Sequence, residues 1–151
     1  MLDEDFRIRF AADTLERSQR GSIVANIWWE GGFGTFPDVG WSDFAVVIVG
    51  WWANAALSLV EGTATSGRLD FMDGPFHAMA SVVDEQRWRI EMIHHGKNTC
   101  EHDIEVAPKL LLSEIWMVGS QVLEACRRNQ WLGDDISRLI KSMNKITRLF
   151  G

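Results

Sequence analysis

The sequence predicts an α+β domain on three observations. The chain has 151 residues, which is the size of one domain, and its contents of hydrophobic residues (46%) and charged residues (24%) are typical of globular proteins. Residues 1–106 contain short alternating segments separated by turn residues, whereas residues 107–151 contain apolar residues at helical spacing. We therefore expect one domain over residues 1–151, with a mainly antiparallel sheet of about five to six strands and, packed on it, one central helix and two C-terminal helices.

Two strands and a glycine-rich loop are expected first. Arg7–Phe10 alternates polar and apolar residues, which is typical of a strand with one buried face. Ser22–Glu30 is rich in β-branched and aromatic residues and predicts a second strand. Gly31–Gly40 contains four glycines and one proline, which favour a loop.

The first helix is expected over Phe44–Val60. This 17-residue segment is nearly long enough to span a membrane, but its tryptophans lie mid-segment and acidic Asp43 and Glu61 flank it. A buried core helix is the better interpretation, with Ser42 or Asp43 as its N-cap and Gly62 at its C-terminal end.

The N-terminus lacks the features of a secretory signal, and two cysteines are too few for a disulfide framework. We therefore expect a cytoplasmic protein without membrane contact.

Four further strands and two helices complete the prediction. The strands are expected at Arg68–Met72, Phe76–Val83, Arg87–Ile93 and Cys100–Val106. One helix is expected over Lys109–Gln130. A second is expected from Asp134 or Asp135 onward, because Gly133 separates two apolar stripes at helical spacing.

Charge is distributed unevenly along the chain. The formal net charge is −6, with −9 in residues 1–106 and +3 in residues 107–151. An acidic chain is poorly suited to bind nucleic acid, because phosphate contacts need clustered lysines and arginines. Alternation in the last strand places Glu101, Asp103 and Glu105 on one face, beside Glu91 or Asp84, with no compensating charge nearby. This acidic stripe (Glu101, Asp103 and Glu105) predicts either a solvated strand edge or a surface for a basic partner.

Three histidines and a cysteine within nine residues are the candidate metal ligands. They are His94, His95, Cys100 and His102. Imidazole and thiolate bind zinc, but this spacing matches no standard zinc site, and adjacent histidines of a strand point to opposite faces. Cys100 and His102 are expected on one strand face, opposite the acidic stripe. We expect turn and core residues here, with no metal, no cofactor and no catalytic group.

Aromatic residues surround the Gly31–Gly40 loop. Phe33, Phe36 and Trp41 are expected either to pack in the core or to line a pocket for a partner. The loop lacks the lysine and serine or threonine of a phosphate-binding P-loop. A small enzyme or ligand-binding domain with a pocket under this loop is one alternative function.

Two stretches of the chain resemble a known class of proteins. FPDVGWSDF (Phe36–Phe44), which leads into a helix bearing Gly50–Trp52, and LDFMDGPF (Leu69–Phe76) are similar to parts of small bacterial proteins. Some of those proteins are encoded as immunity partners of polymorphic toxins in contact-dependent growth inhibition. The resemblance implies a cytoplasmic inhibitor, not an enzyme, that binds and blocks a toxin domain, often a basic nuclease.

We therefore expect an immunity protein that neutralises a cognate toxin by stoichiometric occlusion. Acidic side chains would contact basic toxin residues that normally hold phosphate, and aromatic side chains would anchor the centre of the interface. The expected partner-binding residues are Asp84, Glu91, Glu101, Asp103, Glu105, Phe33, Phe36 and Trp41. A homo-oligomeric structural protein that associates through its final amphipathic helix is a further alternative.

Overall fold

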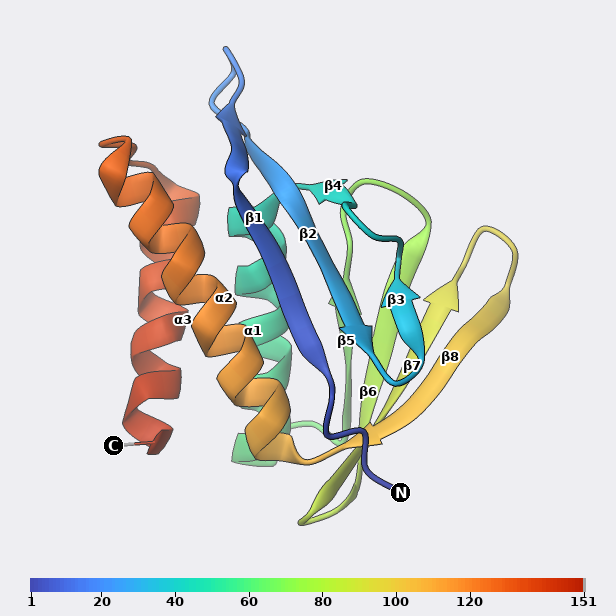
Figure 1. Cartoon of the computed structure of the whole chain (residues 1–151). Coiled ribbons are helices and arrows are strands. Elements are labelled where there is room, and N and C mark those ends of the chain that lie inside the picture. The colour runs from blue at the N-terminus through green and yellow to red at the C-terminus, as the bar shows by residue number, and fades with distance from the viewer. Residues whose placement is uncertain (151) are drawn as a thin grey trace.

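The computed structural model describes residues 1–150 and shows two four-stranded antiparallel sheets and three helices (Figure 1). The prediction of an α+β fold with one central helix and two C-terminal helices is confirmed. The strands, however, divide into two sheets rather than forming one. The division falls at the central helix, which separates the strands of residues 7–43 from those of residues 66–106.

The first sheet contains β1 (Arg7–Arg17), β2 (Ile23–Gly31), β3 (Gly34–Phe36) and β4 (Ser42–Asp43). Strand β2 lies at its centre, with β1 on one side and the two short strands on the other. The prediction of a loop over Gly31–Gly40 is wrong in its first half, because the chain reverses at Gly32 and Phe33 and returns along β2 as β3. Gly34 has a φ of 112°, a value that favours glycine.

The second sheet contains β5 (Ser66–Asp70), β6 (Phe76–Asp84), β7 (Arg87–His94) and β8 (Thr99–Val106), paired in chain order. The predicted alternation in β7 is confirmed, since Trp88, Ile90 and Met92 are all buried. Neighbouring strands are joined by short turns, which is why they pair in sequence order.

A β-bulge in β8 overturns one sequence prediction. Met92 pairs with His102 but Ile93 pairs with Cys100, so Glu101 has no partner on β7. The extra residue moves Cys100 to the opposite face of the strand from His102. Cys100 is exposed, beside Asp103 and Glu91, rather than on the same face as His102 as predicted.

The three helices are α1 (Ala45–Glu61), α2 (Pro108–Arg128) and α3 (Asp134–Phe150). Helix α1 packs against α2 and α3 and against strands of both sheets, which confirms the core helix. It ends at Gly62 in the left-handed conformation, as predicted, but its N-cap is Phe44. Asp43 instead lies in β4, where its buried carboxylate accepts hydrogen bonds from the backbone N–H groups of Phe44 and Met72. None of the helices in residues 1–150 is both long and apolar enough to cross a membrane.

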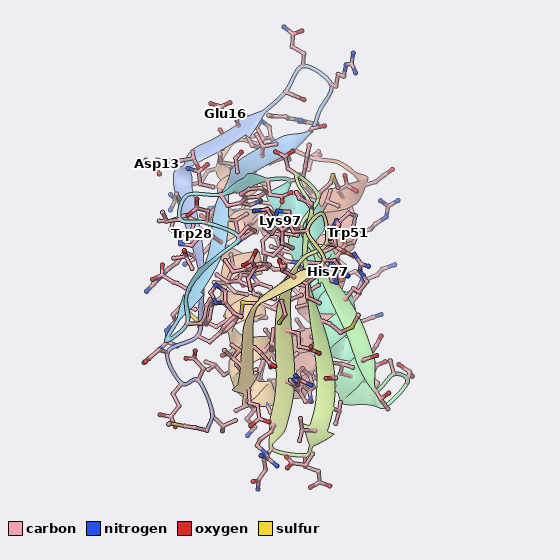
Figure 2. All side chains as sticks on the ribbon, turned by 90° about the vertical axis from the view of Figure 1, so that its right-hand side faces the viewer. Asp13, Glu16, Trp28, Trp51, His77 and Lys97 are labelled. Carbon is pink, nitrogen blue, oxygen red and sulfur yellow. The ribbon has the colours of Figure 1, made fainter. Side chains whose placement is uncertain are left out.

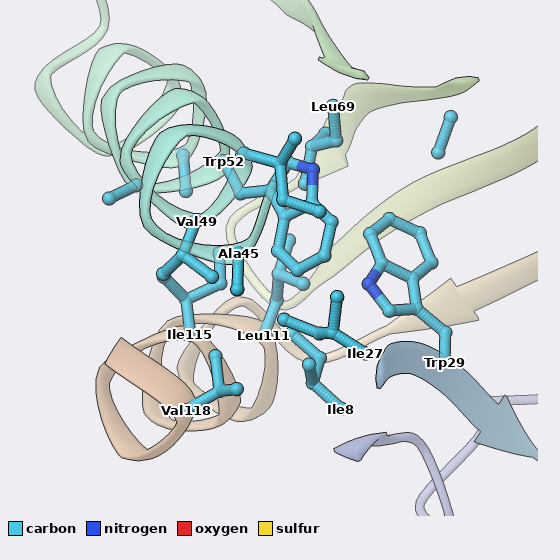
Figure 3. Close-up of a cluster of buried hydrophobic side chains, with 14 of the residues drawn as sticks. Ile8, Ile27, Trp29, Ala45, Val49, Trp52, Leu69, Leu111, Ile115 and Val118 are labelled. Carbon is cyan, nitrogen blue, oxygen red and sulfur yellow. The ribbon is translucent and has the colours of Figure 1, made fainter. Parts of the chain in front are cut away.

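An aromatic cluster joins the two sheets to α1. Trp29 of β2 and Trp52 of α1 are both fully buried, and their rings meet edge to face at 5.3 Å between centroids (Figure 3). Phe71, which follows β5, packs on both of these rings. The cluster holds the second sheet against the first, and so fixes where the outer face of β7 and β8 lies relative to the N-terminal residues.

Candidate interaction surface

The acidic residues of β8 share a sheet face with two arginines of β7. Arg89 donates two hydrogen bonds to Asp103, one from Nε to Oδ1 at 3.0 Å and one from Nη2 to Oδ2 at 2.6 Å. These bonds hold the pKa of Asp103 below its usual range. Glu91 lies 3.7 Å from the same guanidinium. The expectation that no nearby charge compensates the acidic stripe is therefore wrong, because cross-strand neighbours supply that charge.

Arg87, the first residue of β7, links the end of β6 to β8. Its guanidinium lies 2.8 Å from Asp84 and 3.5 Å from Glu105. Hydrogen bonds from Arg87 hold the pKa of Asp84 below its usual range. Glu101 at the bulge is exposed and makes no ion pair within residues 1–150. Of the three carboxylates in the acidic stripe, only Glu101 is thus not paired with an arginine within residues 1–150.

The N-terminal segment adds a second group of carboxylates beside β8. The backbone N–H of Asp3 donates to the carbonyl oxygen of Glu105 at 2.8 Å, and Leu2 forms a parallel bridge with the same residue. The Asp3 carboxylate also accepts a hydrogen bond from the N–H of Gly32 at 3.0 Å. These contacts fix the acidic run Asp3–Asp5 against the edge of β8. The run was visible in the sequence, but nothing local indicated where it would lie.

Together the two groups line an open depression of about 970 Å³. Its charged side chains are five carboxylates and one guanidinium: Asp3, Glu4, Asp5, Asp103, Glu105 and Arg89. Small-molecule sites are usually enclosed and mostly apolar. A wide, acidic and open depression is better suited to the basic side chains of a protein surface.

The predicted aromatic contacts are divided between surface and core. Phe36 is only 1% exposed and packs against Trp29, Phe71 and Phe76, so its assignment as a partner-binding residue is wrong. It fills the space beneath the Gly31–Gly40 segment, where a pocket was the alternative expectation. Phe36 is buried because Phe71 and Phe76, which belong to the β5–β6 region, pack over it. Its neighbours in the sequence do not reveal this contact.

Phe33 and Trp41 are both half-buried. Phe33 follows Gly32, which lines the depression, and its ring packs on His102 at 5.0 Å. Trp41 stacks edge to face on Phe76 at 5.2 Å, and its indole N–H donates to Asp43 at 2.9 Å. Phe33 is therefore half-buried against His102 next to the depression, and the indole N–H of Trp41 is already used in a hydrogen bond within the fold.

The four candidate metal ligands do not converge. Residues 1–150 contain no group of three or more His, Cys, Asp or Glu side chains placed to hold a metal ion. His95 instead pairs with His77 of β6, with their Nδ1 atoms 3.0 Å apart, and His94 accepts a hydrogen bond from the N–H of Lys97. Burial and the charge of Arg68 lower the pKa of His77. This pair could not be found from spacing, because it depends on how the turn after β7 folds over β6.

Comparison of the chain with protein-family models, with curated proteins and with solved structures finds no match. What the chain binds therefore has to be inferred from its own surface.

Proposed function

We propose that the chain is a non-catalytic immunity protein that binds a basic toxin domain and blocks it by occlusion. The observation that carries the proposal is the concentration of five carboxylates against one guanidinium around a single open depression. The resemblance of Phe36–Phe44 and Leu69–Phe76 to immunity-type proteins agrees with this function. The proposal places the interaction in the cytoplasm, where such a toxin would act.

The carboxylates of the depression have two different roles in this proposal. Asp3, Asp103 and Glu105 are held in place by hydrogen bonds or ion pairs, so they present a fixed shape. Glu4 and Asp5 are exposed and make no ion pair within residues 1–150. These free charges, with Glu101 at the bulge, would steer a basic partner toward the surface. Phe33 would add an apolar contact at the rim.

The test compares two charge-removing variants of equal size. The site variant is Glu4→Gln/Asp5→Asn/Glu101→Gln, which removes only carboxylates that make no ion pair. The control is Asp13→Asn/Glu16→Gln/Glu61→Gln, whose residues are also exposed. Asp13 and Glu16 lie on β1, away from its start near the N-terminal segment (Figure 2). Both variants change the net charge equally, so a difference between them reports position.

The partner would be captured from cells of the source organism and then produced alone for growth and binding assays. We expect the parent chain and the control to restore growth of cells expressing the partner, and the site variant to bind it at least about tenfold more weakly. The difference should shrink with salt, because the Debye length falls from ~30 Å at 0.01 M to ~8 Å at 0.15 M. A site variant that protects and binds as well as the control contradicts the proposal.

A further inference from the structure

A second surface lies on the helices α2 and α3, away from the acidic depression. The two helices run antiparallel, joined by residues 129–133 (Figure 1). Between them is a groove of about 450 Å³, whose lining includes Trp116, Leu123, Trp131, Ile140, Asn144 and Thr147. The groove is open, since Trp116 is 37% and Ile140 45% exposed. Two antiparallel helices with an apolar groove between them form a ready site for a third helix.

The groove is held in a fixed shape. The indole N–H of Trp116 on α2 donates to the hydroxyl of Thr147 on α3 at 2.9 Å, which orients the ring across the groove. Tryptophan is among the residues that contribute most at interfaces, and a side chain that is already ordered loses less entropy on binding.

The rims of the groove are basic. Lys141 and Arg148 lie three residues before and four residues after Asn144, so they flank it on the surface of α3. These two residues and Lys145 are exposed and make no ion pair in the part of the chain that the structure describes. On α2, Glu124 is engaged by both Arg127 and Arg128, which leaves that rim with a net positive charge.

We propose that this groove binds an amphipathic helix of another protein whose apolar stripe is flanked by glutamates or aspartates. The apolar stripe would cover Trp116 and Ile140, and its acidic flank would meet Lys141 and Arg148. A second copy of this chain fits less well. Two-fold packing of α3 on α3 would bring the basic stripe of one copy (Lys141, Lys145 and Arg148) close to the same stripe of the other.

The probe is a synthetic amphipathic peptide of about 18 residues, roughly 27 Å long as a helix, with a leucine stripe flanked by glutamates. A matched peptide carries lysines in place of the glutamates. Fluorescence anisotropy of the labelled peptides on the full chain should give a Kd of roughly 1–100 µM for the glutamate peptide, at least about tenfold tighter than for the lysine peptide.

Three variants separate the groove from general charge attraction. Lys141→Glu/Arg148→Glu should reverse the preference between the two peptides. Ile140→Asp should weaken binding of the glutamate peptide at least about tenfold, because it puts an unpaired carboxylate in the apolar contact. Lys97→Glu/Lys109→Glu, which changes exposed lysines elsewhere, should keep the parent's preference.

Several outcomes would overturn the proposal. They are equal binding of both peptides, no binding of either, or a charge-reversal variant that keeps the parent's preference. A dimer in analytical ultracentrifugation that Ile140→Asp abolishes would also overturn it, since a second copy would then occupy the groove. The site variant of the acidic depression should bind the glutamate peptide no more weakly than the parent chain, so this proposal and the proposed function can fail independently.

Discussion

The face of the β5–β8 sheet and the α2–α3 pair carry opposite charges, and local geometry decides how much of each charge remains free. On the sheet, oppositely charged residues of neighbouring strands lie beside one another, so Arg89 clamps Asp103 and Arg87 reaches Glu105. On α3, cations repeat at helical spacing, and none of Lys141, Lys145 and Arg148 meets a carboxylate within residues 1–150. Counting charges along the sequence therefore overstates the free charge of the acidic stripe, whereas three of the four cations of α3 make no ion pair within residues 1–150.

The N-terminal segment changes this comparison, because it brings Glu4 and Asp5 to the sheet, and neither carboxylate makes an ion pair within residues 1–150. The acidity of the depression thus comes from two segments about a hundred residues apart. All residues of the basic stripe, in contrast, come from the single helix α3. The acidic surface should be lost when the N-terminal segment is displaced, whereas the basic stripe should persist as long as α3 stays folded.

The largest expected effect is on the free energy of unfolding, and it compares the two faces of α3. The inner face packs in the core, whereas the outer face is exposed. Leu139 is fully buried, and its neighbour Ile140 is 45% exposed. Leu139→Ala should lower the free energy of unfolding by about 2–5 kcal/mol. Ile140→Ala should lower it by less than ~1 kcal/mol, because an exposed side chain leaves little cavity. Urea denaturation followed by tryptophan fluorescence measures both, and equal losses would contradict the division of the helix into two faces.

A smaller effect compares a buried carboxylate of α2 with an exposed one of β8. Glu114 is only 8% exposed, and its Oε1 accepts a hydrogen bond from the N–H of Ile8 at 2.9 Å. Glu114→Ala should cost about 1–3 kcal/mol, since it leaves a buried donor on β1 without a partner. Glu114→Gln, which keeps an acceptor, should cost less. Asp103→Asn should cost only ~0–1 kcal/mol, because its ion pair is exposed to solvent. If Asp103→Asn lowered the free energy of unfolding as much as Glu114→Ala, the Arg89–Asp103 ion pair would be needed for stability, which contradicts this expectation.

Acid titration compares one arginine-bound carboxylate from each region. Hydrogen bonds from Arg127 lower the pKa of Glu124 from 4.5 to about 2, and those from Arg89 lower the pKa of Asp103. A folded-state pKa below the unfolded value stabilises the fold above the unfolded pKa, and that stabilisation is lost as the pH falls through the folded one. For Glu124 the loss should fall between about pH 4.5 and 2. The pKa values of Glu124 and Asp103 can be measured from the pH dependence of their carboxyl carbon NMR shifts. Values equal to those of unpaired carboxylates would contradict the ion pairs with Arg127 and Arg89.

The smallest expected effect concerns the two thiols, one in each region. Cys100 on β8 is exposed, whereas Cys126 on α2 is 1% exposed. Partial burial and the nearby carboxylates Asp103 and Glu91 raise the pKa of Cys100, so it should react slowly at neutral pH and faster as pH rises. Cys126 should react only after unfolding. Mass spectrometry of alkylated native protein distinguishes the two, and modification of Cys126 first would contradict the packing of α2.

The sequence by itself determined the secondary structure wherever local spacing matched one burial pattern. Trp88, Ile90 and Met92 alternate and are buried on one face of β7, and the apolar run of α1 lies in the core. Gly62 ends α1 because its φ of 76° suits a residue without a side chain. These features depend on neighbours within a few residues, which a sequence displays directly.

Only the tertiary structure decided which surfaces exist. One extra residue at Glu101 moved Cys100 to the other face of β8, and the aromatic cluster between the two sheets buried Phe36. The ion pairs of Arg87 and Arg89, and the position of Asp3 beside Glu105, likewise depend on strand register and on contacts between distant segments. Periodicity identifies the buried face of a strand, but it carries no information about which segment lies next to it. The sequence therefore supplied the charged residues of the candidate site, and the packing of sheet, helices and N-terminal segment decided which of them are free to act.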